Sequence, residues 1–407
     1  MKLLVAVRVT TILATVLVLG GCVTQSVKST SVPSVNGAST TVEETLLLDV
    51  GIAVFDPGIA DYDEEDDERI YPEVRRAESR YMPNLLSEAM QNSGAWGAVR
   101  VVPDNQQITD LMVQGEILHS DGEELKLQIK ATDSRGYVWL DREYSGNASS
   151  YAYKMTTRSS FDPFQAVYNT IANDLLQRQE ELLSEDREKI RTVTELLFAR
   201  SFSADAFDGY LGQNRKEQYV VLRLPAEGDP MLDRVRTIRE RDQMFIDTLQ
   251  DYYVTFDQQM DGPYQEWRKL SYEEAMALKE LKAESTRRLI TGGLAILAGI
   301  AGASQGDSAM TRTAGNVAII GGGYLLKSGL EKRNEAQIHV EALEELGMSL
   351  EAEITPQVIE LDDRTVMLSG NVEDQYAQWR SILAEIYRAE IGELEVPGET
   401  APAADTL

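Results

Sequence analysis

Apolar positions in the first part of the chain follow the short, alternating pattern of β-strands. The predicted strands span residues 46–55, 96–102, 111–118, 125–132 and 137–144. Turns at Asp121-Gly122 and Arg135-Gly136 predict that the last three strands form a hairpin meander. One helix is predicted at residues 73–92, where apolar residues take helical spacing and Ser93-Gly94 provides a stop. The order β-α-β-β-β over residues 46–150 predicts a small α/β domain in which a helix packs on a sheet.

Beyond residue 150 the apolar positions take helical spacing. One helix is predicted from residue 164 to 197, after Asp162-Pro163, because aspartate caps a first turn and proline suits its first position. Asp229-Pro230 repeats this start signal, and residues 219–224 are expected to be a strand or an extended link. Together these patterns predict a long-helix, coiled-coil-like domain over residues 151–288.

From Val235 to Phe256, apolar residues recur alternately three and four apart, as they do along a coiled-coil seam. Asp242 interrupts this seam. Gly262-Pro263 predicts the end of the helix, since proline removes a helical hydrogen bond. Ser271 with Glu274 has the spacing of a capping box, which predicts the start of another helix.

Residues 289–303 and 314–326 carry no charged side chain and are rich in small residues. Small residues four apart lie on one face of a helix and let a second backbone approach closely. The residues that we expect to pack in this way are Ala295, Gly299, Gly302, Ala303, Gly306, Ala318 and Gly322. With the polar residues 305–313 as its tip, the segment 289–330 is predicted to be a glycine-rich helical hairpin.

Three interpretations of this hairpin are open. It inserts into a membrane, where copies pack into an oligomer or pore; its arms pack against each other or against a partner subunit; or it is a buried hairpin of the helical domain. Each arm is shorter than the roughly 20 residues of a spanning helix. Glycine, however, costs roughly 1 kcal/mol inside a water-exposed helix, so its density here favours membrane insertion or close helix contact.

Near the C-terminus, the pattern predicts a small α/β unit over residues 331–392. Its strands are expected at residues 348–354 and 365–368, and its helices at residues 335–346 and 373–389. Residues 393–407 are rich in Ala, Pro and acidic residues and are predicted to be disordered. The fold class predicted for the whole chain is α+β and multidomain.

The composition of the chain restricts its partners. Among 407 residues, 39 are Lys or Arg and 67 are Asp or Glu, so the formal net charge is -28. Such an acidic surface repels phosphate backbones, which excludes nucleic acid as a partner. One cysteine cannot form an internal disulfide, and two histidines far apart in sequence, His119 and His339, do not suggest a metal site. We expect no metal and no cofactor.

The single cysteine, Cys22, follows a basic start and a short apolar core at residues 9–18. The run Leu19-Gly20-Gly21-Cys22 resembles the lipobox of bacterial lipoproteins. This resemblance implies a signal peptide at residues 1–21, cleavage before Cys22, and an acylated thiol that holds the protein to a membrane. The other interpretation is an ordinary signal peptide with an incidental cysteine.

The residues after Cys22 refine this prediction. No aspartate follows the cysteine, so within the lipoprotein family the outer membrane, on its periplasmic side, is expected rather than the inner membrane. Residues 22–45 lack apolar periodicity and begin with a Ser/Thr/Val-rich stretch. They are predicted to be a flexible tether between the lipid and the first domain.

Three sequence segments of the first domain carry a second resemblance. Residues 49–55, 94–102 and 110–117 resemble an envelope superfamily that includes the periplasmic domain of the curli-secretion channel lipoprotein, the N-terminal domain of TolB, and lipoprotein activators of peptidoglycan synthases. The resemblance covers about residues 46–146. It implies a module for binding and assembly, not an enzyme. The acidic loop at residues 61–68 departs from it.

The sequence contains no phosphate-binding glycine loop, nucleophile elbow, HExxH motif or free catalytic cysteine. The acidic loop lacks the ligand spacing of a calcium loop, so a solvated run of charge is the preferred interpretation. We therefore expect a non-enzymatic outer-membrane lipoprotein that is a scaffold or an oligomeric assembly or secretion component of an envelope machine. The alternative is a monomeric, tethered periplasmic regulator of a cell-wall or envelope enzyme.

Overall fold

The structure is a computed structural model of the 407-residue chain. It describes residues 25–28, 32–39, 42–59, 71–103, 107–154 and 161–302. In the C-terminal part it describes residues 338, 340–342, 344–345, 357–360 and 365–390.

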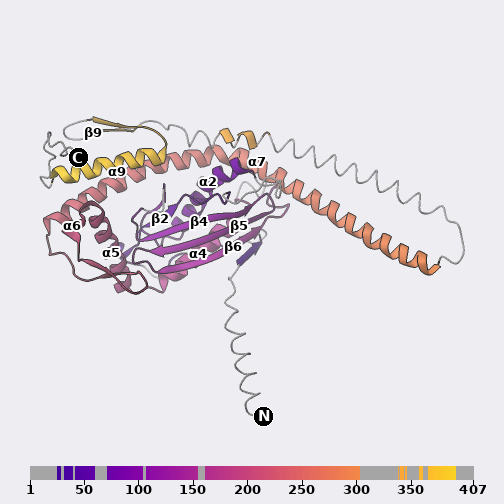
Figure 1. The fold of residues 1–407 in the computed structure, drawn as a ribbon, viewed down its shortest axis with the longest axis horizontal. Coiled ribbons are helices and arrows are strands. Elements are labelled where there is room, and N and C mark those ends of the chain that lie inside the picture. The colour runs from indigo at the N-terminus through magenta and orange to yellow at the C-terminus, as the bar shows by residue number, and fades with distance from the viewer. Residues whose placement is uncertain are drawn as a thin grey trace, which may run out of the picture.

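A six-stranded mixed sheet forms the centre of the molecule, in the order β1-β6-β5-β4-β2-β3 (Figure 1). Its strands are β1 (Gln25–Lys28), β2 (Val50–Ala53), β3 (Val99–Val102), β4 (Leu111–Ser120), β5 (Glu124–Asp133) and β6 (Val138–Asn147). Strands β4, β5 and β6 form the predicted antiparallel meander, whereas β2 runs parallel to both β3 and β4. The predicted combination of helices and a sheet is confirmed.

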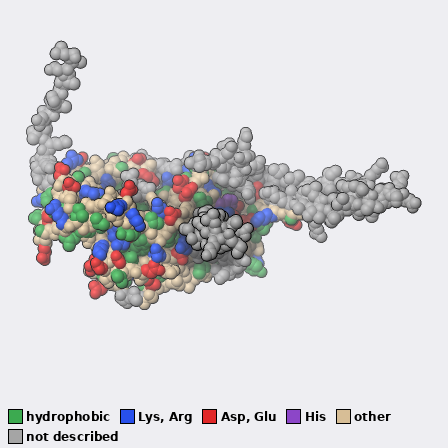
Figure 2. All heavy atoms as spheres, turned by 60° about the horizontal axis from the view of Figure 1, so that its bottom comes forward, with side chains coloured by type: hydrophobic (Ala, Val, Ile, Leu, Met, Phe, Trp, Pro, Cys, Tyr) green, Lys and Arg blue, Asp and Glu red, His purple; other side chains and the backbone are tan. Residues whose placement is uncertain are grey.

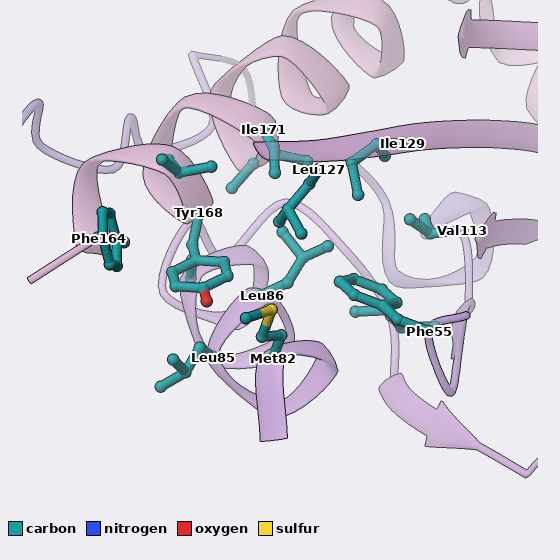
Figure 3. Packing of buried hydrophobic residues seen from close by; sticks show 14 of the residues in the cluster. Phe55, Met82, Leu85, Leu86, Val113, Leu127, Ile129, Phe164, Tyr168 and Ile171 are labelled. Atoms are coloured by element: carbon teal, nitrogen blue, oxygen red, sulfur yellow. The ribbon is translucent and has the colours of Figure 1, made fainter. Parts of the chain in front are cut away.

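Two helices, α2 (Pro72–Gln91) and α4 (Gln165–Glu180), pack with this sheet around one core. Alternate residues of β5 are fully buried, because successive side chains of a strand point to opposite faces. Figure 3 shows Leu127 of β5 among Met82 and Leu86 of α2 and Tyr168 of α4. This core therefore continues across residue 150, where the sequence predicted a domain boundary.

Helix α7 (Pro230–Gly302) is one continuous helix of 73 residues. The predicted break at Gly262-Pro263 is wrong, as is the predicted new start at Ser271. Met260 and Tyr264, on either side of Pro263, are fully buried, and this packing holds the helix on one axis. Gly262 also has no Cβ atom to clash with the ring of the proline that follows.

A second core surrounds the first half of α7. It involves α5 (Ser184–Phe202), α6 (Ala204–Phe207), the hairpin of β7 (Leu211–Gln213) and β8 (Tyr219–Val221), and α9 (Val372–Glu390). The predicted seam of α7 is buried here, but it packs against α5 and α9 rather than against a second long helix. The hairpin of β9 (Gln357–Glu360) and β10 (Thr365–Leu368) adjoins α9, and the strand predicted at residues 348–354 lies outside the described residues.

The single helix predicted for residues 164–197 is divided into α4 and α5. Arg187 of α5 donates from its Nη2 atom to the carbonyl oxygen of Gln179, over 2.7 Å. This bond satisfies a carbonyl group in the last turn of α4 and stabilises the turn between the two helices. At the start of α4, Asp162 caps an entry turn by accepting from the Phe164 N–H, and α4 itself begins at Gln165, one residue later than predicted. Asp229 caps α7 as predicted.

Part of the predicted flexible tether is bound to the body. The tether was predicted to extend over residues 22–45. In the structure residues 25–28 form β1, residues 32–39 lie along α4, and residues 44–46 form the short 3-10 turn η1 (Glu44–Leu46). The side-chain amide of Asn169 donates to the carbonyl oxygen of Pro33 over 2.9 Å, and that of Asn173 donates to Ser34 over 3.0 Å. Polar side chains on α4 thus bind a backbone that carries no apolar pattern of its own.

Gly122, in the turn between β4 and β5, meets the backbone of α7. A Cβ atom at this position would overlap the carbonyl oxygen of Arg268 and the backbone nitrogen of Tyr272. The Gly122 N–H donates to Ser271 Oγ over 3.1 Å, and its carbonyl oxygen accepts from the Tyr153 hydroxyl. Only glycine allows this approach, so the turn fixes where α7 crosses the sheet.

Arg268 fixes the same stretch of α7 from the other side. Its side chain is fully buried, its Nη1 atom donates to Asp162 Oδ2 over 2.7 Å, and its guanidinium lies 3.9 Å from the centre of the Tyr264 ring. The Tyr264 hydroxyl donates to Glu78 Oε1, which also accepts from Ser120 Oγ over 2.5 Å. A buried charge that loses its partner is strongly destabilising. This network therefore opposes any rotation of α7.

Carboxylates crowd the contact between α2 and α7. Burial, together with the charges of Glu88, Asp261 and Asp162, raises the pKa of Asp257 to about 7. Burial also raises the pKa of Glu88. The folded state therefore disfavours the ionised form of Asp257 where α2 packs against α7.

We predict that Gly122→Ala lowers the free energy of unfolding by about 1–3 kcal/mol, because the added methyl group must displace the backbone of α7. Urea denaturation of the Cys22→Ser protein measures this change. The control is Gly37→Ala, where a Cβ atom would meet nothing within 4 Å and the effect should stay within about 0.5 kcal/mol. Equal effects of the two substitutions would contradict the close approach at Gly122.

Asp257→Asn is expected to stabilise the protein at pH 8 and to have little effect near pH 4. The pKa of Asp257 is higher in the folded state than its ordinary value of 3.8, so its ionisation destabilises the fold fully above about pH 7 and not at all below about pH 4. The rise corresponds to about 4 kcal/mol at most, and partial contact with water reduces the effect that we expect to about 1–2 kcal/mol. Thermal denaturation at both pH values measures it.

The matched control for Asp257→Asn is Asp251→Asn, an exposed carboxylate on the same helix, which should change stability little at either pH. A destabilising effect of Asp257→Asn at pH 8 would show that its carboxylate is not held unfavourably between α2 and α7.

Candidate functional site

The predicted functional residues are only partly within the described structure. Ala295, Gly299 and Gly302 lie in the last turns of α7, whose backbone is helical through Gly302. Cys22 and the remaining predicted packing residues (Ala303, Gly306, Ala318 and Gly322) lie outside the described residues. The predicted lipid attachment and the second arm of the hairpin therefore stay predictions. In the part of the chain that is described, no helix combines the length and the apolar character needed to cross a membrane.

The end of α7 extends beyond the body of the molecule (Figure 1). Ala275 is the last fully buried residue of the helix within its described side chains, and Lys279 makes a final ion pair with Glu123 at the β4–β5 turn. Glu280 and Ala283 are exposed. The 24 residues from Lys279 to Gly302 span about 35 Å as a helix. The uncharged residues 289–302 are thus carried away from both cores.

The body itself presents charges of both signs. Figure 2 shows acidic and basic side chains interspersed over one face, without a large area of a single charge. Charged side chains of the body also form ion pairs, as between Arg100 and Asp247, whose closest atoms lie 2.5 Å apart. This face offers no extended basic surface for a polyanion, in agreement with the net charge.

A cavity of about 370 Å³ lies between α5, α7, α9 and the segment that follows β3. Its apolar wall includes Pro103, Ile108 and Phe198, and the ring of Tyr376 joins this wall from α9. A volume of this size can hold a small molecule or one side chain of a partner. The cavity lies near the carboxyl end of β3, where open α/β sheets commonly place ligand sites.

Two contacts hold α7 in place beside this cavity. The side-chain amide of Gln250 pairs with the backbone of Val101 in edge strand β3, accepting from its N–H and donating to its carbonyl oxygen, each over 2.9 Å. Arg100 binds Asp247 one turn earlier on α7. The edge of the sheet is thereby covered by side chains of α7, and Asp242 is positioned about one further turn toward the N-terminus of the helix.

Asp242 is the most unusual residue of the cavity. It is 2% exposed, and its Oδ1 atom has no hydrogen-bond partner among the described residues. Its Oδ2 atom lies 3.6 Å from Arg380 Nη1 and accepts from the Tyr376 hydroxyl at the long distance of 3.5 Å. Burial raises the pKa of Asp242 to about 6, against the opposing effects of Arg380, Tyr376 and Arg239.

Arg380 is held by several groups at once. Besides Asp242, its guanidinium contacts Ser201 Oγ over 3.4 Å and lies 4.5 Å from the ring centre of Phe202 and 5.3 Å from that of Phe198. The aromatic faces and the carboxylate both favour the charged guanidinium. Arg380 therefore acts mainly as a structural partner of Asp242 and of α5.

A smaller cavity of about 30 Å³ lies behind the first and shares Gln107, Ile108, Phe198 and Asp242 with it. This volume suits about one water molecule. The side-chain oxygen of Gln107, like Oδ1 of Asp242, is buried without a hydrogen-bond partner in the described structure. Two acceptor atoms without donors thus belong to residues that line both cavities.

One weak indication of this site is present in the sequence. Asp242 interrupts an otherwise apolar seam, and a charged residue in such a place is either structural or functional. Nothing in the sequence connects it to Gln107, Glu373 or Arg380, because these residues lie far apart along the chain and belong to no motif. The cavity was therefore not predicted.

The other candidates for chemistry do not form a second site within the described residues. His119 lies 3.2 Å from Asp121 beside the β4–β5 turn, and His339 is outside the described residues, as is the acidic loop at residues 61–68. In the ranges that the structure describes, no group of three histidine, cysteine or acidic side chains is arranged to hold a metal ion.

Comparisons with known proteins give no relative for this chain. No protein-family model matches it, no curated protein matches its sequence, and no solved structure matches its fold.

Proposed function

We propose that this protein is a lipid-anchored, non-enzymatic scaffold of the cell envelope, which faces the periplasm from the outer membrane and assembles with further copies through the end of α7. The observation that carries the proposal is the course of α7. Its first part is fixed in two cores, and its continuation brings the uncharged residues 289–302 beyond the ion pair of Lys279 with Glu123, the last contact with the body among the described side chains.

An isolated helical arm of this composition needs a partner. Residues 289–302 include four glycines, which weaken a helix in water, and no charge that would favour solvation. Ala295 and Gly299 are four apart and share a helix face, which would let another helix approach closely. A second copy of the chain offers the same face, and symmetric association of identical copies is the commonest form of assembly.

The proposed anchor would hold the body close to the membrane. Only two residues separate Cys22 from the start of β1, which pairs with β6, so an acylated Cys22 would lie within about 10 Å of that sheet edge. Residues 32–39 are bound along α4 and add no free length. This arrangement supports a membrane-proximal scaffold over the alternative of a regulator that reaches across the periplasm on a long tether.

Deletion of residues 289–330 from the exported Cys22→Ser protein is expected to convert an oligomer into a monomer. The proposal attributes the association of copies to the end of α7 and the segment that follows α7. The deletion should therefore abolish this association. Light scattering after size-exclusion chromatography in mild detergent measures the mass of each species. Deletion of residues 393–407, the predicted disordered tail, is the control. It should leave the number of copies in each oligomer unchanged.

A Cys22→Ser protein that is monomeric with residues 289–330 present would overturn the proposed assembly. Fractionation of the same cells then separates two forms of the proposal. Retention in the membrane pellet through alkaline washes, lost on deletion, would assign the segment to the membrane. Release as a periplasmic oligomer would assign it to contacts between copies.

A further inference from the structure

The cavity between α5, α7 and α9 has the features of a formed binding site that the proposed assembly does not use. Its position is on the body, whereas the proposed contacts between copies are at the end of α7. Asp242 is almost completely buried, and its Oδ1 atom has no donor within the described residues. Burying an acceptor without a partner is costly, so such a group is expected to have a role or an occupant.

The polar groups of the cavity are rich in acceptors and poor in free donors. Asp242 Oδ1 and Gln107 Oε1 are buried acceptors without hydrogen bonds among the described residues. Glu373 adds a carboxylate that is 38% exposed at the rim, with its Oε1 atom 3.9 Å from Arg80 Nη2. The guanidinium of Arg380 is already engaged by Asp242, by Ser201 and by two aromatic rings. A bound group should therefore donate hydrogen bonds and carry positive charge.

The remaining wall of the cavity is apolar. Pro103, Ile108 and Phe198 line it, and Tyr376 presents an aromatic ring. Apolar walls stabilise a hydrocarbon stem, and aromatic rings are also favourable neighbours of a cation. The Oδ1 atom of Asp242, unpaired among the described residues, is the acceptor that a cation on such a stem would meet.

We propose that this cavity binds a primary ammonium group carried on a short apolar stem, as in a small amine or the side chain of a lysine, with Asp242, Gln107 and Glu373 as its acceptors. The volume of about 370 Å³ accommodates such a group with its stem but not a large polar ligand. Asp242 supplies the charge at the inner end of the cavity and Glu373 the charge at its entrance.

The test compares three probes that each contain five carbon atoms and differ in the polar group: pentylamine, pentanol and pentanoate. Each is titrated into the full-length Cys22→Ser protein at pH 7.5 by ligand-observed NMR. We expect pentylamine to bind at least tenfold more tightly than the other two. Equal binding of pentylamine and pentanol, tighter binding of pentanoate, or no binding of any probe would overturn the proposal.

Substitutions then locate the bound amine. Asp242→Asn should weaken pentylamine at least tenfold and leave pentanol within twofold, whereas Asp251→Asn, on the exposed surface of the same helix, should change neither. If Asp242→Asn does not fold, Glu373→Gln at the rim should still weaken pentylamine about threefold. Unchanged pentylamine binding in a folded Asp242→Asn or Glu373→Gln variant would contradict the assigned acceptors.

The pH dependence provides a further readout. Arg380 and Tyr376 of α9 and Arg239 of α7 face the Asp242 carboxylate, and Glu373 lines the same cavity. Because the pKa of Asp242 is raised to about 6, its negative charge is present at pH 7.5 and largely lost at pH 5. Affinity for pentylamine should therefore fall at least fivefold between pH 7.5 and pH 5. Affinity that is unchanged over this range would count against Asp242 as an acceptor.

The outcome of these binding experiments is independent of oligomer formation, which the deletion of residues 289–330 tests.

Discussion

The position of α7 on the sheet depends on the contact between its backbone and Gly122. At this contact a strand turn and a helix approach more closely than any side chain would permit. Arg268, in the same turn of α7, is buried against Asp162 and Tyr264. Sterics and a buried charge thus fix both the location and the rotation of the helix, and the two cores form on the faces that this orientation buries.

A buried ion pair contributes less to net stability than its geometry suggests, because both charges lose their hydration. Its larger effect is to disfavour other orientations of α7, since a rotation of α7 would leave Arg268 or Asp162 buried without a partner. The aromatic groups around Arg268 favour the same arrangement. This specificity matters for the distant parts of the helix. Small rotations at Arg268 would move both Asp242 in its cavity and the uncharged residues 289–302.

The sequence was sufficient to predict the structure where local pattern and tertiary packing agree. The alternating residues of β4, β5 and β6 and the turn at Gly122 predicted the meander, and the cap at Asp229 predicted the start of α7. It was insufficient at Pro263, where the local helix-breaking signal is opposed by buried Met260 and Tyr264. It was also insufficient for residues 32–39, which are ordered by asparagines of α4 rather than by their own pattern.

The candidate cavity illustrates a different limit. Its residues come from the segment after β3 and from three helices, and only the fold brings Gln107, Asp242 and Arg380 together. Asp242 alone was visible in the sequence, as an interruption of a seam. The proposed anchor and arm, in contrast, rest on local features of the sequence, namely the lipobox-like run ending at Cys22 and the small residues at the end of α7.

Both the fixed body and the extended arm depend on the continuity of α7. Spin labels at Met244 and Glu280, two exposed positions on either side of Pro263, can be placed by cysteine substitution in the Cys22→Ser protein. One continuous helix places these positions about 54 Å apart, with a narrow distribution of distances by pulsed electron spin resonance. A markedly shorter or broad distribution would show that the helix bends or ends at Pro263, and would contradict the account.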